Sequence, residues 1–111
     1  MKKSRWILLV SSISLLILGT ESCVHRKSEP HSVTLTWRVP PPKPGITVVG
    51  YNVYRRTGDG GPFVKIADQV PGAAYEDRIV STGRTYFYVV TAVDQDGRES
   101  RFSAETKAEI P

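Results

Sequence analysis

Hydrophobic and polar residues alternate with a period of two through most of the chain from residue 33 onward. In the segment VTLTWR (33–38), Val, Leu and Trp occupy alternate positions, and two Thr and one Arg lie between them. Successive side chains of a β-strand point to opposite faces, so this pattern predicts a strand with one buried face. The same period predicts further strands over 48–56, 63–67, 74–78, 84–94 and 102–110.

Turn-forming residues separate these segments. Gly58–Gly61 (GDGG), Pro71-Gly72 and Asp96-Gly97 fall between predicted strands, and glycine accepts positive φ at little steric cost. The proline-rich stretch 40–45 (PPPKPG) cannot lie inside a strand, because proline lacks the donor that a ladder needs. Short strands with frequent turns predict an all-β protein, an antiparallel β-sandwich or barrel.

The alternation also predicts which side chains form the core. The chain has one cysteine, so an intramolecular disulfide is excluded and the fold depends on packing. The predicted core residues are Val33, Leu35, Trp37, Tyr51, Val53, Ile66, Tyr75, Val80, Tyr86, Tyr88, Val90 and Ala92.

Residues 1–22 have the pattern of a signal peptide. Lys2, Lys3 and Arg5 precede an apolar run at 6–18, which Gly19 ends. This run is shorter than the roughly 20 apolar residues that a membrane-spanning helix needs. We therefore expect export of a mature domain over 32–111, behind a polar tether at 23–31.

The single cysteine, Cys23, stands where the apolar run passes into the mature chain. The segment resembles a bacterial lipoprotein signal, in which this thiol is acylated and becomes the new N-terminus. The resemblance implies lipidation at Cys23 and attachment to the cell membrane or outer membrane. Because Val24 rather than Asp follows the cysteine, the resemblance favours the outer membrane in a Gram-negative host. Thr20-Glu21-Ser22 also fits ordinary secretory cleavage, which would give a secreted or periplasmic protein, and an uncleaved anchor is a third alternative.

Net charge excludes one class of partner. Without the leader's three basic residues and one acidic residue, 12 Lys and Arg face 10 Asp and Glu, so the net charge is +2. The longest basic cluster, Arg55–Arg56, is expected to be a solvated strand edge. Because no basic stripe could follow a phosphate backbone, we expect no nucleic-acid partner.

The segments VTLTW, GYNVYRR, FVKIA, AYEDRIV, GRTYFYVVTAVDQDGRES and FSAE resemble, in order, the strands of a bacterial fibronectin type III domain. The resemblance implies an immunoglobulin-like antiparallel β-sandwich with Trp37 on strand B and with Tyr51 and Val53 in the core on strand C. It implies that Tyr86 forms the tyrosine corner, a phenol bonded to nearby backbone. Only about 28–31 remain for strand A, so we expect that strand to be short or missing.

No set of residues has the pattern of a catalytic or metal site. His25 and His31 lie in or beside the tether without a partner set, and neighbouring Glu76 and Asp77 should point to opposite faces of a strand. Gly58–Gly61 precedes a strand, so it lacks the helix N-terminus of a phosphate cradle. We expect a non-catalytic protein without a cofactor.

Binding is therefore the function to consider, and two surfaces are candidates. If Tyr86 and Tyr88 face inward, then Tyr54, Phe87 and Val89 share the outer face of the sheet, where they form either a partner surface or ordinary cross-strand packing.

The loops at 40–48 and 94–100 are the second candidate surface, and the latter contains Arg98. The expected partner is a protein or an envelope polysaccharide. The alternatives are a structural or assembly subunit that pairs through an edge strand and a carbohydrate-binding accessory domain.

Overall fold

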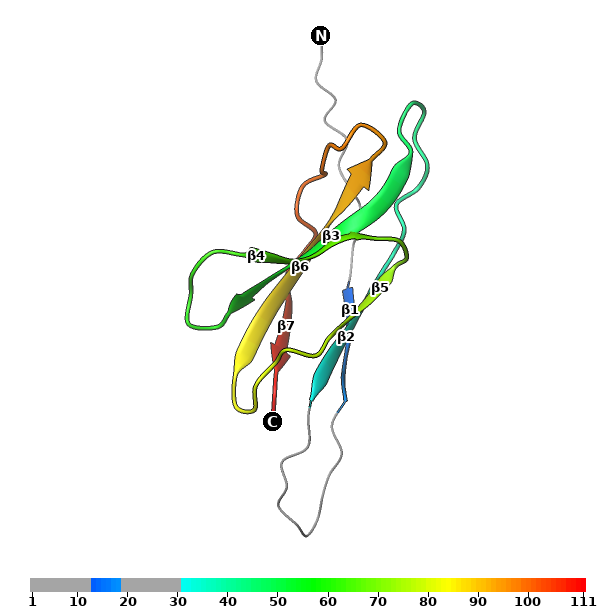
Figure 1. The fold of residues 1–111 in the computed structure, drawn as a ribbon. Coiled ribbons are helices and arrows are strands. Elements are labelled where there is room, and N and C mark those ends of the chain that lie inside the picture. Colours follow the sequence, from blue (N-terminus) through cyan, green and yellow to red (C-terminus); the bar gives the residue numbers. More distant parts are fainter. Residues whose placement is uncertain (1–12, 19–30) are drawn as a thin grey trace.

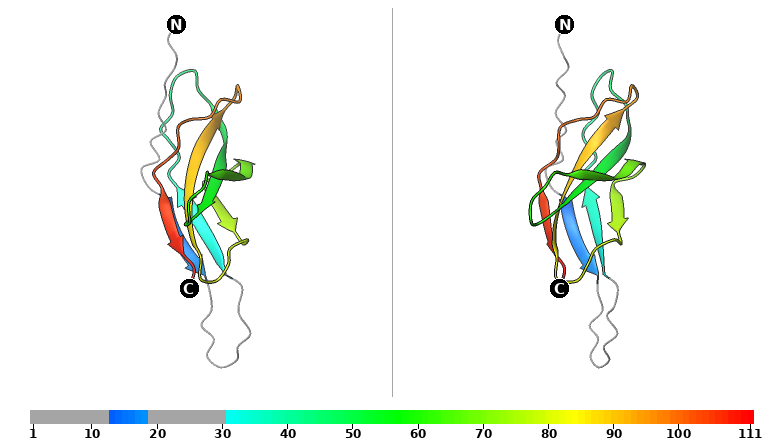
Figure 2. Two further views of the ribbon diagram at one scale, coloured as in Figure 1. Left: turned by 90° about the vertical axis from the view of Figure 1, so that its left-hand side faces the viewer. Right: turned by 60° about the vertical axis from the view of Figure 1, so that its left-hand side comes forward.

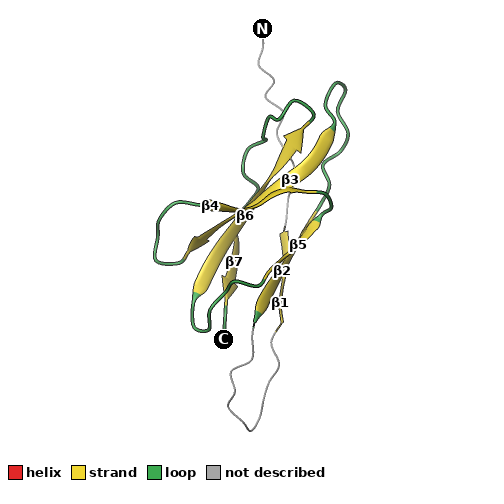
Figure 3. Cartoon of the chain, in the orientation of Figure 1, coloured by secondary structure: helices red, strands yellow, loops and turns green. Residues whose placement is uncertain are grey.

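The computed structural model describes residues 13–18 and 31–111. Within them the chain forms strands and loops without any helix, as Figures 1 and 3 show. Consequently, no helix in these two stretches could cross a membrane. The strands are β1 (Ile13–Leu18), β2 (Ser32–Trp37), β3 (Val48–Thr57), β4 (Val64–Val70), β5 (Ala74–Asp77), β6 (Thr85–Asp94) and β7 (Thr106–Glu109).

The strands form two antiparallel sheets that pack as layers (Figure 2). One sheet has the order β1-β2-β5 and the other has the order β4-β3-β6-β7. The longest pairing joins β3 and β6, from Val48 opposite Asp94 to Thr57 opposite Tyr86. This arrangement confirms the predicted immunoglobulin-like β-sandwich.

The core lies between the sheets and contains most of the side chains that the alternation predicts. Ile66, Tyr75 and Val80 are only partly buried, because the first two lie on edge strands and the third lies in a loop. The Trp37 ring packs edge-on against Tyr51, with 5.4 Å between centroids. The buried cluster comprises Val33, Leu35, Trp37, Tyr51, Val53, Tyr86, Tyr88, Val90, Ala92, Ala108 and Ile110.

The strand at the A position differs from the prediction. It is neither short nor missing, because β1 pairs antiparallel with β2 over six residues, from Ile13 opposite Trp37 to Leu18 opposite Ser32. These residues belong to the apolar run of the predicted signal peptide. The edge of β2 presents backbone groups that need partners, and an apolar segment rich in Ile and Leu supplies them. Cys23 and most of the tether lie outside the described residues.

The last strand is shorter than the predicted 102–110. Before β7, two serine side chains replace ladder bonds with β6: Ser100 Oγ accepts the Ala92 amide and Ser103 Oγ accepts the Val90 amide, at 2.9 and 3.0 Å. The amides of the same serines donate to the carbonyls of Ala92 and Val90, each at 2.9 Å. The three-residue spacing of these serines does not fit the period of two of a regular strand.

The two ends of the domain lie together. The start of β2 and the C-terminus are at the same end of the sandwich, whereas the β2–β3 connection and the β6–β7 turn are at the opposite end (Figure 1). A chain that enters the fold at β2 therefore presents these two loops at the end distant from its point of entry.

Candidate functional site

Three aromatic rings form a chain on the outer face of the four-stranded sheet. The Phe102 ring lies 5.1 Å from the Tyr54 ring and 5.5 Å from the Phe63 ring, measured between centroids. Phe102 is 51% exposed, and Val64 beside Phe63 is 59% exposed. The sequence pattern predicts Tyr54 on this face. It does not predict that Phe102 packs against Tyr54 or that Phe63 packs against Phe102.

A cation completes this surface. The Arg56 guanidinium lies 4.2 Å from the centroid of Phe87 and 5.3 Å from that of Phe63, and it pairs with Glu105 at 3.2 Å. Arg56 and Phe87 are register partners on β3 and β6, so the sheet itself sets this stack. We call Tyr54, Arg56, Phe63, Phe87, Val89 and Phe102 the outer-face cluster.

Val89 is buried, although the alternation predicts it on the exposed outer face. Alternation places it on the outer face, opposite Tyr54 in the register, yet it is only 2% exposed. The segment 99–105 returns along β6 and packs Phe102 against Tyr54, which removes this part of the sheet from water. Val89 is therefore covered by the cluster and is not accessible to a partner.

A polar network adjoins the rings. One oxygen of Glu99, Oε2, accepts bonds from Asn52 Nδ2 at 2.6 Å, from Thr91 Oγ1 at 2.9 Å and from the Tyr54 hydroxyl. Burial favours a raised pKa for the Glu99 carboxyl, but these hydrogen bonds outweigh it and the pKa lies below its usual value. Burial, followed by the bond to Glu99, raises the pKa of Tyr54 to about 12. Tyr54 is therefore held as a neutral donor.

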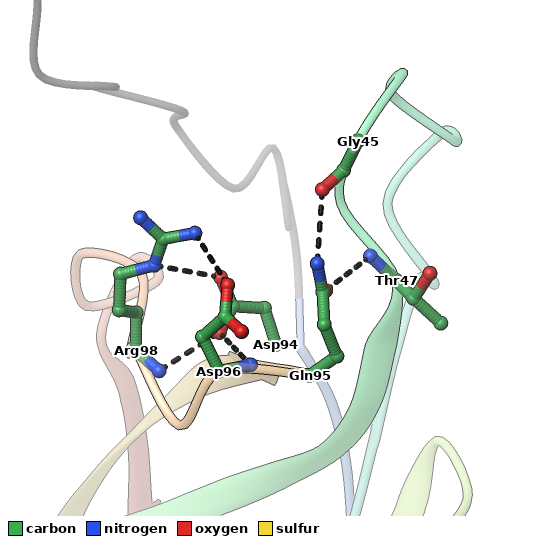
Figure 4. A network of polar contacts seen from close by, with 6 residues as sticks. All are labelled: Gly45, Thr47, Asp94, Gln95, Asp96 and Arg98. Carbon is green, nitrogen blue, oxygen red and sulfur yellow. Dashed lines mark hydrogen bonds and ion pairs between the residues drawn. The ribbon is translucent and has the colours of Figure 1, made fainter.

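The loops at the far end of the sandwich are joined by one glutamine. Gln95 Nε2 donates to the Gly45 carbonyl at 3.0 Å, and Gln95 Oε1 accepts the Thr47 amide at 2.7 Å (Figure 4). These bonds connect the β6–β7 turn to the proline-rich β2–β3 connection. The β2–β3 connection and the β6–β7 turn, which contain the two predicted binding loops, therefore form one preorganised ledge. Val39 lies in the connection just before the predicted loop at 40–48 and is 63% exposed.

Arg98 belongs to this ledge and not to the outer-face cluster. Its Nε donates to Asp94 Oδ2 and its terminal nitrogen to Asp96 Oδ2, both at 3.1 Å (Figure 4). Buried Asp94 also accepts the amides of Asp96 and Arg98 through Oδ1. Burial favours a raised pKa for Asp94, but these bonds and the Arg98 charge bring the pKa below its usual value. Arg98 therefore holds the turn together.

A third polar group connects the two sheets. Asp77 Oδ2, from β5, accepts Arg55 at 2.7 Å and the Tyr88 hydroxyl at 2.6 Å, both from the opposite sheet. Arg55 is thus not the expected solvated edge, because it shares the inward face of β3 with Tyr51 and Val53. Burial and the bond to Asp77 raise the pKa of Tyr88.

Together, these arrangements suit recognition by stacking and hydrogen bonding. In each of the three networks the carboxylate is held by hydrogen bonds or ion pairs within that network. Among residues 13–18 and 31–111, no group of three or more His, Cys, Asp and Glu is placed to hold a metal ion.

Comparison with solved structures decides the family. An Fn3-like protein from Clostridium thermocellum is 40% identical to this chain, with a TM-score of 0.60 over 72% of this chain and 77% of that one. The chain belongs to the fibronectin type III-like family. A human FNIII domain covers 98% of this fibronectin type III-like chain with a TM-score of 0.70, and at 20% identity it supports the fold alone. No family model matches the sequence.

Relatives of this fibronectin type III-like domain also occur within much longer proteins. An amylopullulanase from Thermoanaerobacterium saccharolyticum is 46% identical over 59 residues, which are 53% of this chain and 5% of that enzyme. An amylopullulanase from Thermoanaerobacter thermohydrosulfuricus is 50% identical over 60 residues, 54% of this chain and 4% of that enzyme. The chain thus matches only a small segment of these enzymes.

Proposed function

We propose that the protein is an exported, non-catalytic binding module, held on the cell envelope by a lipid on Cys23. The arrangement of the ends is the observation that carries this proposal. A tether at 23–31 would enter the fold at the start of β2, at the same end as the C-terminus. The ledge formed by the β2–β3 connection and the β6–β7 turn would then project away from the membrane.

The ledge and the outer-face cluster are the two surfaces offered to a protein or envelope polysaccharide. Each has an exposed apolar side chain, Val39 on the ledge and Phe102 on the cluster. Phe102 also packs on Tyr54 and Phe63, so its removal should cost more stability than that of Val39. Ile79, which is 75% exposed in the β5–β6 connection, provides a matched control.

The test compares Val39→Ser, Phe102→Ser and Ile79→Ser in the full chain, purified with its partners from detergent-solubilised envelopes. We expect one of the first two substitutions to remove the co-purifying partner while the variant remains folded at the temperature of purification. Ile79→Ser should retain the partner. Loss of partner in all three variants, or in none, would contradict binding through either surface.

Assembly through an edge strand is a second candidate, and the β1–β2 pairing favours it. This pairing indicates that the β2 edge accepts an antiparallel strand over its whole length. If cleavage removes β1, that edge becomes available to another chain. Analytical ultracentrifugation of the cleaved protein distinguishes the two, because assembly predicts oligomers and the binding module predicts monomers.

Carbohydrate binding is a third candidate, and the match to segments of two amylopullulanases favours it. The exposed ring of Phe102, with Arg56 and Glu99 nearby, provides stacking and hydrogen-bonding groups of the kind a sugar needs. Affinity electrophoresis in gels containing pullulan tests it. Retardation of the wild type that is lost in Phe102→Ser supports this function, and equal migration with and without pullulan excludes it.

A further inference from the structure

A hollow opens beside the outer-face cluster, at the end of the sandwich where the C-terminus lies. It lies between the β3–β4 turn, the β5–β6 connection and β7, and its volume is about 370 Å³. The lining includes Gly58, Arg84, Thr85, Phe87 and Lys107. It is separate from the ledge and from the exposed ring of Phe102.

The pairing of the strands explains why this space is empty. Arg56, Phe87 and Lys107 are register partners and form a row of large side chains across β3, β6 and β7. Beyond that row, Gly58 donates its amide to the Thr85 carbonyl at 2.7 Å. A Cβ on Gly58 would lie 3.0 Å from Thr85 Cβ, so a larger residue here would require Thr85 to shift by a few tenths of an ångström. Because Gly58 and Thr85 are small, the space beside the row is unfilled and forms the hollow.

Two basic side chains, Arg84 and Lys107, and one acidic side chain, Asp59, line the hollow. Arg84 is exposed, and its guanidinium has no carboxylate partner among the residues that the structure describes. Its backbone is fixed, because the Arg84 amide donates to Ser81 and the Arg84 carbonyl accepts from Ile110. Lys107 pairs with exposed Glu109 at 3.0 Å. The acid in the lining, Asp59, accepts the Thr57 hydroxyl.

We propose that this hollow is a binding site for a small molecule that carries an oxyanion, with Arg84 as the principal ligand-binding residue. A guanidinium binds a carboxylate or phosphate through two parallel hydrogen bonds, and a lysine adds a point charge. The volume is at the lower end of small-molecule sites, so the ligand is the size of one sugar ring or smaller. Carboxylate and phosphate share this chemistry.

The test is a titration of the full chain, in detergent and at constant ionic strength, followed by amide NMR shifts. Inorganic phosphate and glucuronate are the two probes, and sodium chloride is the reference salt. We expect saturable shifts at Gly58, Arg84 and Thr85 with at least one probe, and the tighter probe identifies the source of the oxyanion. Arg84→Gln should weaken binding about tenfold, as expected for loss of a charged hydrogen bond.

Arg101→Gln is the matched control, because Arg101 is another exposed arginine and does not line the hollow. It should bind both probes as the wild type does. Shifts that grow linearly without saturation, or that sodium chloride reproduces, would overturn the proposal. Equal weakening by Arg84→Gln and Arg101→Gln would also overturn it, because that result describes general attraction to a basic surface.

Discussion

The carboxylate of Asp77 lies between the sheets, where it accepts hydrogen bonds from Arg55 and Tyr88. The Asp77 side chain is 3% exposed, so its removal leaves a partly buried guanidinium and a buried hydroxyl without their acceptor. We predict that Asp77→Ala lowers the free energy of unfolding by about 3 kcal/mol. Urea denaturation measures this loss.

The neighbouring residue provides the control for this prediction. Glu76 lies beside Asp77 on β5 but pairs at the surface with Arg78, whose side chain is 75% exposed. Glu76→Gln should change the unfolding free energy by less than about 0.5 kcal/mol. Equal losses in the two variants would show that Asp77 does not connect the sheets.

Tyr86 gives a prediction about a single hydrogen bond. Its hydroxyl accepts the Ser81 amide at 2.9 Å, as the tyrosine-corner resemblance predicts. Tyr86→Phe should cost about 1 kcal/mol in urea denaturation, because the Ser81 amide loses its partner. The hydroxyl of partly buried Tyr75 has no hydrogen-bond partner among residues 31–111, so Tyr75→Phe should cost less. A larger loss in Tyr75→Phe would contradict this account of the corner.

At the scale of elements, the β6–β7 turn should make the fold sensitive to acid. The pKa of Asp94 is lowered in the folded state, so its contribution to stability is fully present above the unfolded pKa of about 4. That contribution is lost as the pH falls through the lower folded pKa. We predict that the urea midpoint falls between pH 5 and pH 3, and that Glu99 adds to this fall because its pKa is also lowered.

Asp94→Asn tests this assignment. The variant should be less stable than the wild type at pH 7 and should lose less stability between pH 5 and pH 3. Glu109→Gln, which removes an exposed carboxylate from β7, should leave the acid dependence close to that of the wild type. An unchanged acid dependence in Asp94→Asn would place the sensitivity elsewhere in the chain.

The strands differ in how closely their observed ranges match the ranges predicted from the sequence. The predicted ranges of β3 and β6 agree with the structure to within one residue at each end, because long alternating runs carry a strong period-two signal. β7 could not be predicted as well, since the side chains of Ser100 and Ser103 take the place of backbone partners. β1 could not be separated from a signal peptide, because one apolar segment suits either role.

The candidate site was less predictable than the fold. Alternation placed Tyr54, Phe87 and Val89 on one face, but the burial of Val89 depends on the later segment that carries Phe102. Arg55 shares the inward parity of Val53, and its partner Asp77 lies 22 residues away along the chain. Such contacts depend on how the two sheets and the segment 99–105 pack together. Local periodicity carries no information about that packing.

At the scale of the whole molecule, the edge of β2 should differ between the full chain and a chain without residues 1–22. The amides of β2 that face away from β5 bond with β1 in the full chain. We predict that hydrogen exchange at these amides becomes faster when residues 1–22 are removed, while exchange in β3 and β6 stays slow. Unchanged protection of β2 in a monomeric cleaved chain would contradict this prediction.

The proposed anchoring and orientation depend on whether the chain is cleaved before Cys23. A chain that starts at an acylated Cys23 has lost β1, enters the sandwich at β2 and presents the Gln95 ledge away from the membrane. Intact mass spectrometry of the protein isolated from envelopes tests this most directly. We predict the mass of residues 23–111 increased by acyl chains on Cys23. The mass of the whole chain from Met1, with an unmodified Cys23, would contradict the proposed anchoring and orientation.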